Sequence, residues 1–275
     1  MVFRIVSDSS SNVFNLSEAD YKSVPLKIIT TAKEYVDDEN LDIEQMVNEV
    51  RETKGKSGTS CPNMGEWLDA FEGADCVFAI TITKKLSGSY ASAVQAAEEY
   101  EKTHEGAKVY VIDSTSTGGE MRLIMEFLRD RINEGKTFEE IKEEVTKYHE
   151  TTHLLFCLES LTNLARNGRV NPAVAKIAGV LGIRVVGAAT EGVLDPLHKV
   201  RGAAKAVETL YKEMKLRGYK GGKVAISHCF NMDSANALKD AILGDFPKAS
   251  VFIEPTTALC SFYAERGGMI IGYEG

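Results

Sequence analysis

Segments rich in serine, threonine and aspartate recur at the ends of predicted strands and the starts of predicted helices. They are residues 7–11 (SDSSS), 59–62 (TSCP), 84–90 (KKLSGSY) and 113–119 (DSTSTGG). In an α/β sheet such positions gather at one edge, where ligands bind. Helix amino ends and hydroxyl donors together bind a small anion, either a carboxylate or a phosphate. Because Ser and Thr donate hydrogen bonds without charge, the pattern indicates that a carboxylate is held rather than transformed.

For any single segment, helix capping is the more ordinary explanation of these residue types. Asn63 and Glu66 are spaced as a capping box, and Pro62 is suited to the first position of that helix. The recurrence of hydroxyl-rich segments at several helix starts is what favours an anion site.

Residues 149–153 read His-Glu-Thr-Thr-His, which is the motif of zinc proteases. In those enzymes both histidines lie on one face of a helix and the glutamate is the general base. Here the preceding helical pattern ends at the β-branched Thr151 and Thr152, and His153 begins a strand-like run. We therefore interpret the match as coincidental and expect no metal site.

Other motifs of catalysis or phosphate binding are incomplete. Residues 55–57 (GKS) resemble the end of a phosphate-binding loop, but position 50, where that loop needs glycine, is Val50. His228 and Cys229 are neighbours on a predicted strand, so their side chains point to opposite faces and form no dyad. We expect no catalytic residues in this chain.

Arg166 and Arg169 flank the predicted turn at residues 167–168. A solvated turn and a contact to an anion or a partner explain the two arginines equally well, because guanidinium groups serve both roles. The residues alone leave both interpretations open.

The first half of the chain alternates short apolar runs with amphipathic helical patterns. Residues 3–6, 77–82 and 109–112 are short and β-branched, as buried strands are, and apolar residues recur at helical spacing over 46–50 and 121–132. This alternation predicts an α/β domain, an α/β/α sandwich with helices on both faces of its sheet.

The second half predicts a further α/β domain with a mixed sheet. Its expected elements are strands at 154–158, 223–227, 250–254 and 269–272, a β-hairpin over 184–194, and helices from Pro172 to Leu181, over 203–214 and from about residue 233. We place the domain boundary near residue 150, giving domains 1–150 and 151–275. No Pro/Gly/Ser-rich linker separates them, so we expect two closely packed domains.

Composition excludes several classes of protein. The chain has 275 residues and a net charge of −8, which disfavours nucleic-acid binding. No apolar run approaches the roughly 18 residues that span a bilayer. The first residues run directly into a predicted strand, without the pattern of a signal peptide. The five cysteines include no CxxC pair, so neither a zinc cage nor a disulfide framework is indicated. We expect a cytoplasmic protein.

Five segments, taken in order, resemble the motifs of the DegV family of bacterial lipid-binding proteins. These segments are residues 5–10 (IVSDSS), 59–62 (TSCP), 86–93 (LSGSYASA), 113–119 (DSTSTGG) and 161–170 (LTNLARNGRV). Each motif alone is weak, but five in order over most of the chain are specific.

The resemblance implies a two-domain fold that holds one long-chain fatty acid between the domains. The resemblance implies that Thr59 or Ser60, together with Ser87, hydrogen-bonds the ligand carboxylate, with Ser89 nearby. Arg169 matches a family arginine that lies close to the ligand head or the docking surface. The acyl tail would lie in a buried tunnel of the second domain. The family's partner is a fatty-acid kinase, which phosphorylates the bound acid for phospholipid synthesis. The resemblance implies no cofactor beyond this ligand.

The sequence departs from the family pattern in two places. Much of the family carries a Gly-Thr-His-Thr-Gly-Pro-Gly stretch near its end, whereas residues 254–263 here read EPTTALCSFY, and Asn167 replaces the first glycine of a Gly-Gly-Arg motif. Thr257 or Tyr263 is a candidate replacement donor for the missing histidine. The alternative function is a small-molecule enzyme, a phosphotransferase or hydrolase acting on a carboxylate or phosphate in the same pocket.

Overall fold

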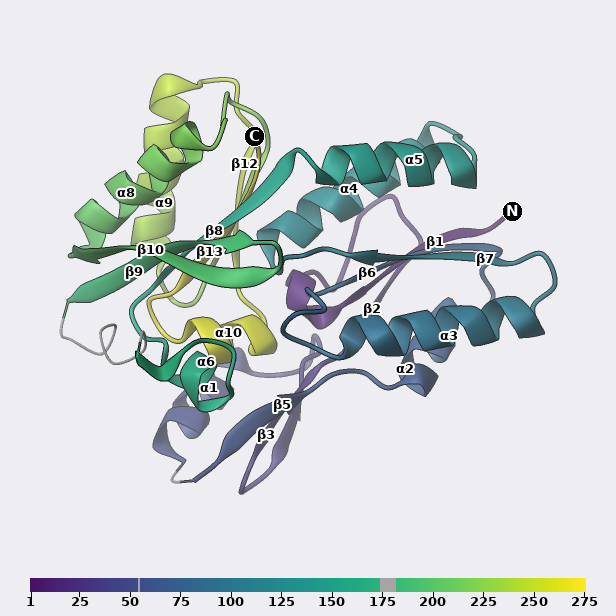
Figure 1. Cartoon of the computed structure of the whole chain (residues 1–275), viewed down its shortest axis with the longest axis horizontal. Helices are drawn as coiled ribbons and strands as arrows, with labels where there is room; N and C mark the ends of the chain where they lie inside the picture. The colour runs from purple at the N-terminus through teal and green to yellow at the C-terminus, as the bar shows by residue number, and fades with distance from the viewer. Residues whose placement is uncertain (54, 174–181) are drawn as a thin grey trace.

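The computed structural model describes residues 1–53, 55–173 and 182–275, and these residues form three β-sheets with helices on their faces (Figure 1). The first sheet has the order β2-β1-β6-β7, and its strands pair in parallel. Its strands are β1 (Phe3–Asp8), β2 (Tyr21–Val24), β6 (Cys76–Thr81) and β7 (Lys108–Asp113). Its helices are α2 (Met64–Phe71), α3 (Ser89–Thr103), α4 (Gly119–Asn133) and α5 (Phe138–His149).

Alternating side chains of this sheet face two different helix pairs. Ile5 and Phe78 pack with α4 and α5, whereas Val6 and Val77 pack with α2 and α3. Successive residues of a strand point to opposite faces, so a strand buried on both faces is largely apolar, as β6 is from Cys76 to Ile80. The predicted α/β/α sandwich is confirmed.

The second sheet is mixed, with the order β10-β9-β8-β13-β11-β12. Its strands are β8 (Thr152–Leu158), β9 (Ile183–Thr190), β10 (Val193–Arg201), β11 (Val224–His228), β12 (Val251–Pro255) and β13 (Met269–Glu274). One face packs against α8 (Ala203–Leu216) and α9 (Met232–Asp245), and the other packs against α6 (Thr162–Arg166) and α10 (Ala258–Ala264). The hairpin predicted over residues 184–194 is confirmed as the antiparallel pair β9–β10.

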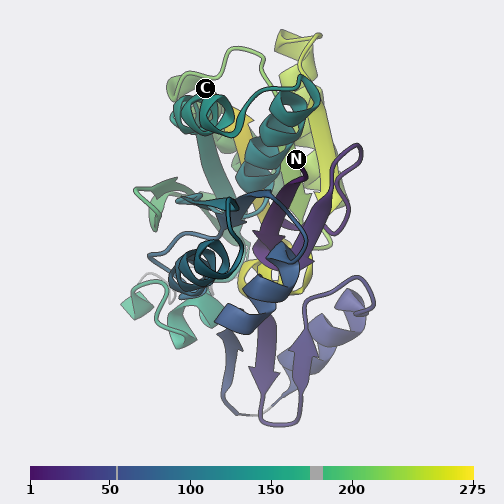
Figure 2. The ribbon, with the colours of Figure 1, turned by 90° about the vertical axis from the view of Figure 1, so that its right-hand side faces the viewer.

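A small antiparallel sheet with the order β4-β3-β5 was not predicted from the sequence. It consists of β3 (Lys27–Thr30), β4 (Glu34–Val36) and β5 (Ser57–Ser60), with α1 (Ile43–Glu52) in the same segment of the chain, and it projects from the body of the molecule (Figure 2). Residues 57–60 read SGTS, a run without the apolar pattern that marks a strand.

The segment around Thr59 differs from the expectation that it opens a helix. Thr59 and Ser60 lie on β5, and α2 begins later, after its N-cap Asn63, which forms the predicted capping box with Glu66. Pro62 therefore precedes the cap instead of occupying the first helical position. The capping side chains, rather than the proline, set the start of this helix.

Helix α4 belongs to the first half of the chain but packs directly on the second sheet. A Cβ atom at Gly119 would lie 2.3 Å from the Ala225 carbonyl oxygen, and one at Gly272 would lie 2.1 Å from the Glu120 nitrogen. Only glycine at both positions lets the backbone of α4 touch β13 and β11. This contact fixes the two halves against each other.

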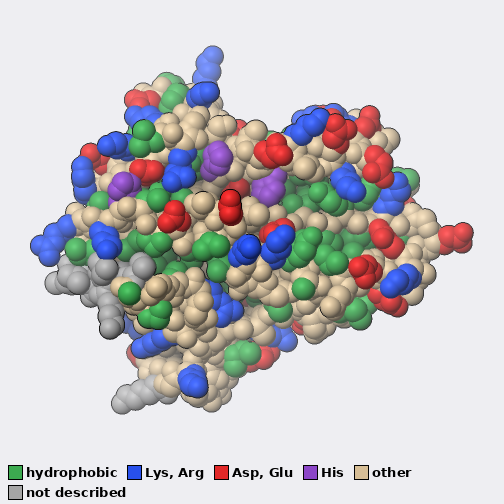
Figure 3. Space-filling model, viewed as in Figure 1, with side chains coloured by type: hydrophobic (Ala, Val, Ile, Leu, Met, Phe, Trp, Pro, Cys, Tyr) green, Lys and Arg blue, Asp and Glu red, His purple; other side chains and the backbone are tan. Residues whose placement is uncertain are grey.

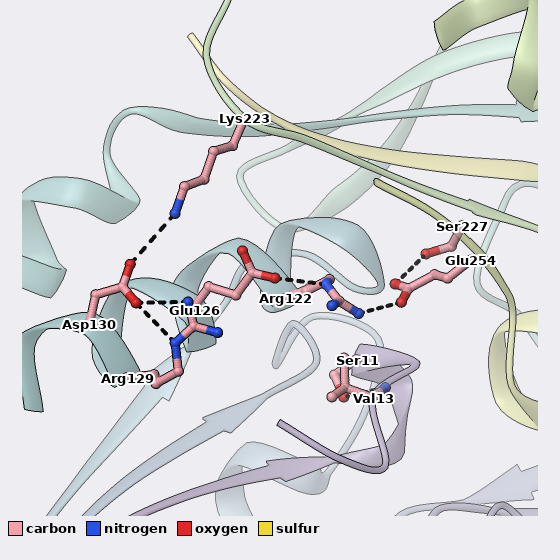
Figure 4. Close-up of polar contacts among 9 residues, drawn as sticks. All are labelled: Ser11, Val13, Arg122, Glu126, Arg129, Asp130, Lys223, Ser227 and Glu254. Atoms are coloured by element: carbon pink, nitrogen blue, oxygen red, sulfur yellow. Dashed lines mark hydrogen bonds and ion pairs between the residues drawn. The ribbon is translucent and has the colours of Figure 1, made fainter. Parts of the chain in front are cut away.

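Charged side chains extend the same junction along α4 (Figure 4). Arg122 donates to Glu126 at 2.9 Å on its own helix and to Glu254 of β12. Further along α4, Asp130 pairs with Lys223 at 3.7 Å. Burial raises the pKa of the Glu254 carboxyl, and the Arg122 guanidinium opposes that effect. The Arg122 pairs are largely removed from solvent, so loss of the arginine would leave buried carboxylates unpaired.

A buried carboxylate joins the small sheet to α10. Asp37 follows β4 and is fully buried. Its carboxylate accepts hydrogen bonds from the backbone nitrogens of Ala258 at 2.7 Å and Leu259 at 3.0 Å, and from the Thr257 hydroxyl at 3.2 Å. These groups form the amino end of α10, where a negative charge is favoured. Asp37 therefore positions a C-terminal helix from an N-terminal loop.

Two expectations remain predictions. The boundary at residue 150 falls between α5 and β8, but α4 and α10 each pack across it. The helix expected from Pro172 to Leu181 falls largely on residues 174–181, which lie outside the described residues.

Across the three described ranges, no helix combines the length and apolarity needed to cross a bilayer.

Replacing Asp37 with Asn tests the energetic state of this carboxylate. Burial raises the pKa of Asp37 from its usual 3.8 to about 6. Between these values the folded state holds a proton that the unfolded state has released, so stability from this group is complete below about pH 4 and is lost as the pH rises through about 6. The quantity to measure, by urea titration, is the free energy of unfolding of the wild type minus that of Asp37→Asn. We expect this difference to fall by about 3 kcal/mol between pH 4 and pH 7.

The difference between the two proteins removes the contribution of every other titrating group. A difference that is independent of pH would mean that Asp37 has the same pKa in the folded and unfolded states.

Candidate functional site

A cavity of about 290 Å³ lies between the two halves of the chain. Its apolar lining residues are Leu26, Cys61, Ile82, Leu86, Leu154, Phe156, Leu158, Leu164, Leu194, Leu259, Cys260, Ala264 and Ile270. Its polar lining residues are Thr59, Ser60, Ser87, Thr117, Arg169 and Tyr263, and Gly88 completes the wall. The lining is thus mostly aliphatic, with a small set of polar groups, as in sites for amphipathic small molecules.

The apolar wall is built on the second sheet. Leu154, Phe156 and Leu158 alternate along β8 and therefore share one face of the strand. Ile270 of β13 pairs directly with Phe156 and continues the same surface. Leu194 of β10 lies on the same sheet, and leucines from α6 and α10 pack over this surface, so the second half supplies an extended hydrophobic floor.

The polar end is built mainly by the first half. Thr59 and Ser60 end β5, and Ser87 lies in the loop between β6 and α3. The Tyr263 hydroxyl of α10 lies 2.8 Å from the Thr59 hydroxyl. Three short elements, far apart in sequence, thereby bring uncharged O–H groups to the cavity wall, and two of these groups, those of Thr59 and Tyr263, lie within hydrogen-bond distance of each other.

Arg169 lines the cavity and also fixes its wall. Its Nε donates to the Leu86 carbonyl at 3.3 Å, and its Nη1 donates to the Asn167 carbonyl at 2.6 Å. These bonds place two of the guanidinium nitrogens on backbone oxygens, and a guanidinium carries five N–H donors in all. The arginine holds the loop that carries Ser87.

Ser89, expected near the ligand head, does not line the cavity. It begins α3, is fully buried, and its hydroxyl donates to Asp8 at 2.6 Å. Asp8 also accepts from the Ile82 nitrogen at 2.9 Å, so one carboxylate holds both ends of the loop that bears Ser87. Burial raises the pKa of Asp8, against the hydrogen bonds from Ser10 and Ser89 that favour its charged form. The side chain of Ser89 turns inward because a buried carboxylate needs donors.

The two candidate replacements for the missing histidine occupy different places. The Thr257 hydroxyl donates to Asp37, its backbone nitrogen donates to Asn12 Oδ1 at 2.9 Å, and the residue does not line the cavity. Tyr263 lines the cavity beside Thr59. Cys61 and Thr117 belong to the hydroxyl-rich segments that the sequence placed at the ligand-binding edge, although neither was named as a site residue. The sequence offered no signal for Cys260, because its placement depends on long-range packing.

Cys260 is a lining residue without nucleophilic character. Burial raises the pKa of its thiol to about 12, so it remains protonated at neutral pH. Its Sγ contacts the Ser10 carbonyl oxygen at 3.3 Å. The nucleophile in cysteine chemistry is the thiolate, so this residue acts as an apolar wall.

The zinc-protease motif is split between two elements. His149 is the last residue of α5 and its Nε2 lies 2.8 Å from the Ser114 carbonyl oxygen, whereas His153 lies on β8 beside Tyr273. The two imidazoles therefore do not share a helical face. Nowhere in the described ranges do three or more His, Cys, Asp or Glu side chains gather as a metal site.

Acidic and basic side chains are interspersed on the face seen in Figure 3, with hydrophobic side chains gathered in a band across its middle. No large patch of a single charge stands out on this face. Electrostatic attraction does not single out a docking position here.

Solved structures of similar proteins share this fold. The Streptococcus pneumoniae Fatty Acid Kinase (Fak) B3 protein, loaded with linoleic acid, has a TM-score of 0.98 and 41% identity, and the match covers 100% of this chain and 99% of that chain. A DegV family protein from Eubacterium eligens, loaded with heptadecanoic acid, has a TM-score of 0.97 and 43% identity, with 99% of each chain covered. The two-domain α/β fold expected from the sequence is confirmed.

Sequence comparison agrees with the structural one. A DegV domain-containing protein from Streptococcus pneumoniae is 42% identical over 279 residues, covering 100% of this chain and 99% of that protein. The family model described as the DegV family of uncharacterised proteins matches residues 2–274. This chain belongs to the DegV family.

Proposed function

We propose that the protein binds one long-chain fatty acid, with the carboxylate at the hydroxyl-lined end of the cavity and the acyl tail on the apolar floor. The observation that carries the proposal is the combination, in one cavity, of uncharged donors at Thr59, Ser87 and Tyr263 with an aliphatic wall from β8. Two relatives of similar length and fold were crystallised with fatty acids, which supports this ligand class.

The physical chemistry of the ligand fits this arrangement. A tail of about 14 to 16 methylenes, at about 0.8 kcal/mol each, contributes roughly 11 to 13 kcal/mol of transfer free energy. Loss of freedom on association offsets a large part of that gain. A buried carboxylate without partners would cost several kcal/mol, so the hydroxyl donors are needed for net binding.

The same donors hold a carboxylate without transforming it. Among the described residues that line the cavity, none is a histidine, aspartate or glutamate, so none of them could be the base that activates a lining hydroxyl or thiol. General acid–base and nucleophilic catalysis both need such groups within reach of the substrate. We therefore favour a binding protein over a phosphotransferase or hydrolase.

We further propose that the protein presents its fatty acid to a fatty-acid kinase. The support is the whole-chain similarity to the protein named Fatty Acid Kinase (Fak) B3. Incubating the loaded protein with a bacterial fatty-acid kinase and ATP should yield an acyl phosphate, detected by mass spectrometry after trapping with hydroxylamine. Free fatty acid supplied without the protein is the control. Equal yields with and without the protein would contradict presentation.

Lipid extraction tests the binding proposal most directly. Protein purified from a bacterial host under native conditions should release close to one fatty acid per chain when it is denatured and extracted, as measured by quantitative mass spectrometry. The long apolar floor makes dissociation during purification slow. An unrelated protein purified in parallel gives the background. Protein that is empty, and whose melting temperature does not change with added fatty acids, would exclude this function.

Hydroxyl deletion tests the placement of the carboxylate. Ser87→Ala and Tyr263→Phe should each weaken binding about 10-fold to 100-fold, because a hydrogen bond to a charged group contributes about 1.5 to 3 kcal/mol. Displacement of a fluorescent fatty acid measures the affinity. Ser92→Ala is the matched control, since Ser92 lies on α3 outside the cavity lining. Unchanged affinity in both variants, with melting temperatures preserved, would move the carboxylate elsewhere.

A further inference from the structure

A hydrogen bond from Thr83 joins the turn that precedes Ser87 to the second half of the chain. The Thr83 hydroxyl donates to the Gly192 carbonyl oxygen at 3.0 Å, and Thr83 is 3% exposed. Gly192 lies at the tip of the β9–β10 hairpin, which is directed toward the first sheet (Figure 1). The hairpin tip therefore contacts the loop that carries a candidate donor to the ligand carboxylate.

The hairpin tip extends beyond the strand that supports it. β8 pairs with β9 over residues 185–188, whereas the pairing between β9 and β10 continues to Thr190 and Val193. Leu194, which lines the cavity, belongs to this extension. Within the described parts of the chain, the Thr83 bond is the only hydrogen bond between the hairpin and the first half. The hairpin tip and the turn thus hold each other through one hydrogen bond.

The two residues of the hairpin tip have a conformation that suits this contact. Glu191 and Gly192 have φ angles of 50° and 80°, and positive φ at both positions is typical of a type I′ turn. A Cβ atom at Gly192 would lie 2.3 Å from Thr83 Oγ1 and 3.2 Å from Lys85 Cγ. Glycine at this position therefore serves both the turn and the close approach of the threonine.

Thr83 also closes the turn that leads to Ser87. Its hydroxyl oxygen accepts from the Lys85 nitrogen at 3.2 Å, and its carbonyl oxygen accepts from the Leu86 nitrogen at 3.1 Å. Its own nitrogen donates to the Ser116 carbonyl oxygen at 3.0 Å. Every hydrogen-bonding group of this threonine thus has a partner, and a shift of its side chain is transmitted to the turn.

The Ser87 hydroxyl depends on the turn for its direction. Its oxygen accepts from the Ser89 nitrogen at 3.2 Å, and a hydroxyl has one hydrogen to donate. In the proposed function that hydrogen is donated to the ligand carboxylate. Hydrogen bonds weaken steeply as their angle departs from linearity, so a displaced turn would weaken this bond without removing the hydroxyl.

We propose that Thr83 is a positioning residue for the ligand carboxylate, acting through Ser87, and that its bond to the hairpin tip at Gly192 holds it in place. The inference rests on the proposed fatty-acid function and adds the contact by which the second half of the chain influences the hydroxyl donors of the first half.

Removing the Thr83 hydroxyl tests this role. Thr83→Val keeps the branched shape of the side chain and should weaken fatty-acid binding about 2-fold to 10-fold, the effect of one hydrogen bond. Thr83→Ser keeps the hydroxyl and should bind as the wild type does. Displacement of a fluorescent fatty acid measures the affinity. Thr81→Val is the matched control, since the buried Thr81 hydroxyl has no hydrogen-bond partner among the residues described.

A double-mutant cycle shows whether Thr83 acts through Ser87. Ser87→Ala removes the hydroxyl that the turn positions, so Thr83→Val should cause no further loss of affinity in that background. General loosening of the cavity wall would instead cause the same loss in both backgrounds. An equal effect of Thr83→Val with and without the Ser87 hydroxyl would overturn the proposal, as would Thr83→Val protein that binds as tightly as the Thr81→Val control.

A substitution at the hairpin tip reaches the same contact without changing the turn, and it tests the proposal even if Thr83→Val does not fold. Gly192→Ala places a methyl group against the Thr83 hydroxyl and should weaken binding in the wild type but not in the Ser87→Ala background. Gly135→Ala controls for backbone strain, since Gly135 has a φ angle of 76° and nothing within 4 Å of an added Cβ. Equal affinities of the Gly192→Ala and Gly135→Ala proteins would overturn the role of the hairpin.

The outcomes distinguish this inference from the function on which it rests. Wild-type protein that binds no fatty acid would contradict the proposed function. If the wild type binds and Ser87→Ala weakens binding, while Thr83→Val and Gly192→Ala bind as their controls do, only the role of Thr83 is contradicted.

Discussion

Two buried carboxylates hold the polar end of the cavity in place. Asp8, at the end of β1, accepts hydrogen bonds from both ends of the loop that carries Ser87, and Asp37 accepts them from the start of α10, which carries Tyr263. Removing a carboxylate from water is unfavourable unless donors replace the water. The chain meets this requirement with backbone N–H groups and hydroxyls. The short 3-10 helix η1 (Ser9–Ser11) and its neighbours are hydroxyl-rich for that structural reason.

The hydroxyl side chains at this edge of the sheet form two groups. Some donate to the two buried carboxylates, and only the others line the cavity. Ser10 and Ser89 satisfy Asp8, and Thr257 satisfies Asp37, whereas Thr59 and Ser87 remain on the cavity wall. The carboxylates thus act as internal anchors. In the proposed function, the carboxylate held by the outer hydroxyls is a second, separate negative charge, and Arg169, which lines the same cavity, would be the cation that offsets it.

The sequence predicted what depends on local patterns and missed what depends on distant contacts. Buried strands such as β6, and the capping box at Asn63, follow from short-range periodicity and capping chemistry. The strand at Thr59 could not be predicted from its own residues, because it forms by pairing with β3, where Ile28 is the partner of Thr59. The inward turn of Ser89 could not be predicted either, because its partner Asp8 lies 81 residues away in sequence. Tyr263 was one of two candidates, and only the position of α10 distinguishes it from Thr257.

The cavity exists only while the two halves of the chain are joined. Helix α4 belongs to the first half and touches β13 through Gly119 and Gly272, while α10 belongs to the second half and is capped by Asp37 of the first. Each half therefore supplies an element that the other half needs to complete its own packing. A fatty acid that contacts both walls binds the joined state and has no comparable site on separated halves, so its binding free energy adds to the free energy that holds them together. Binding of the fatty acid and packing of the two halves against each other are therefore thermodynamically linked.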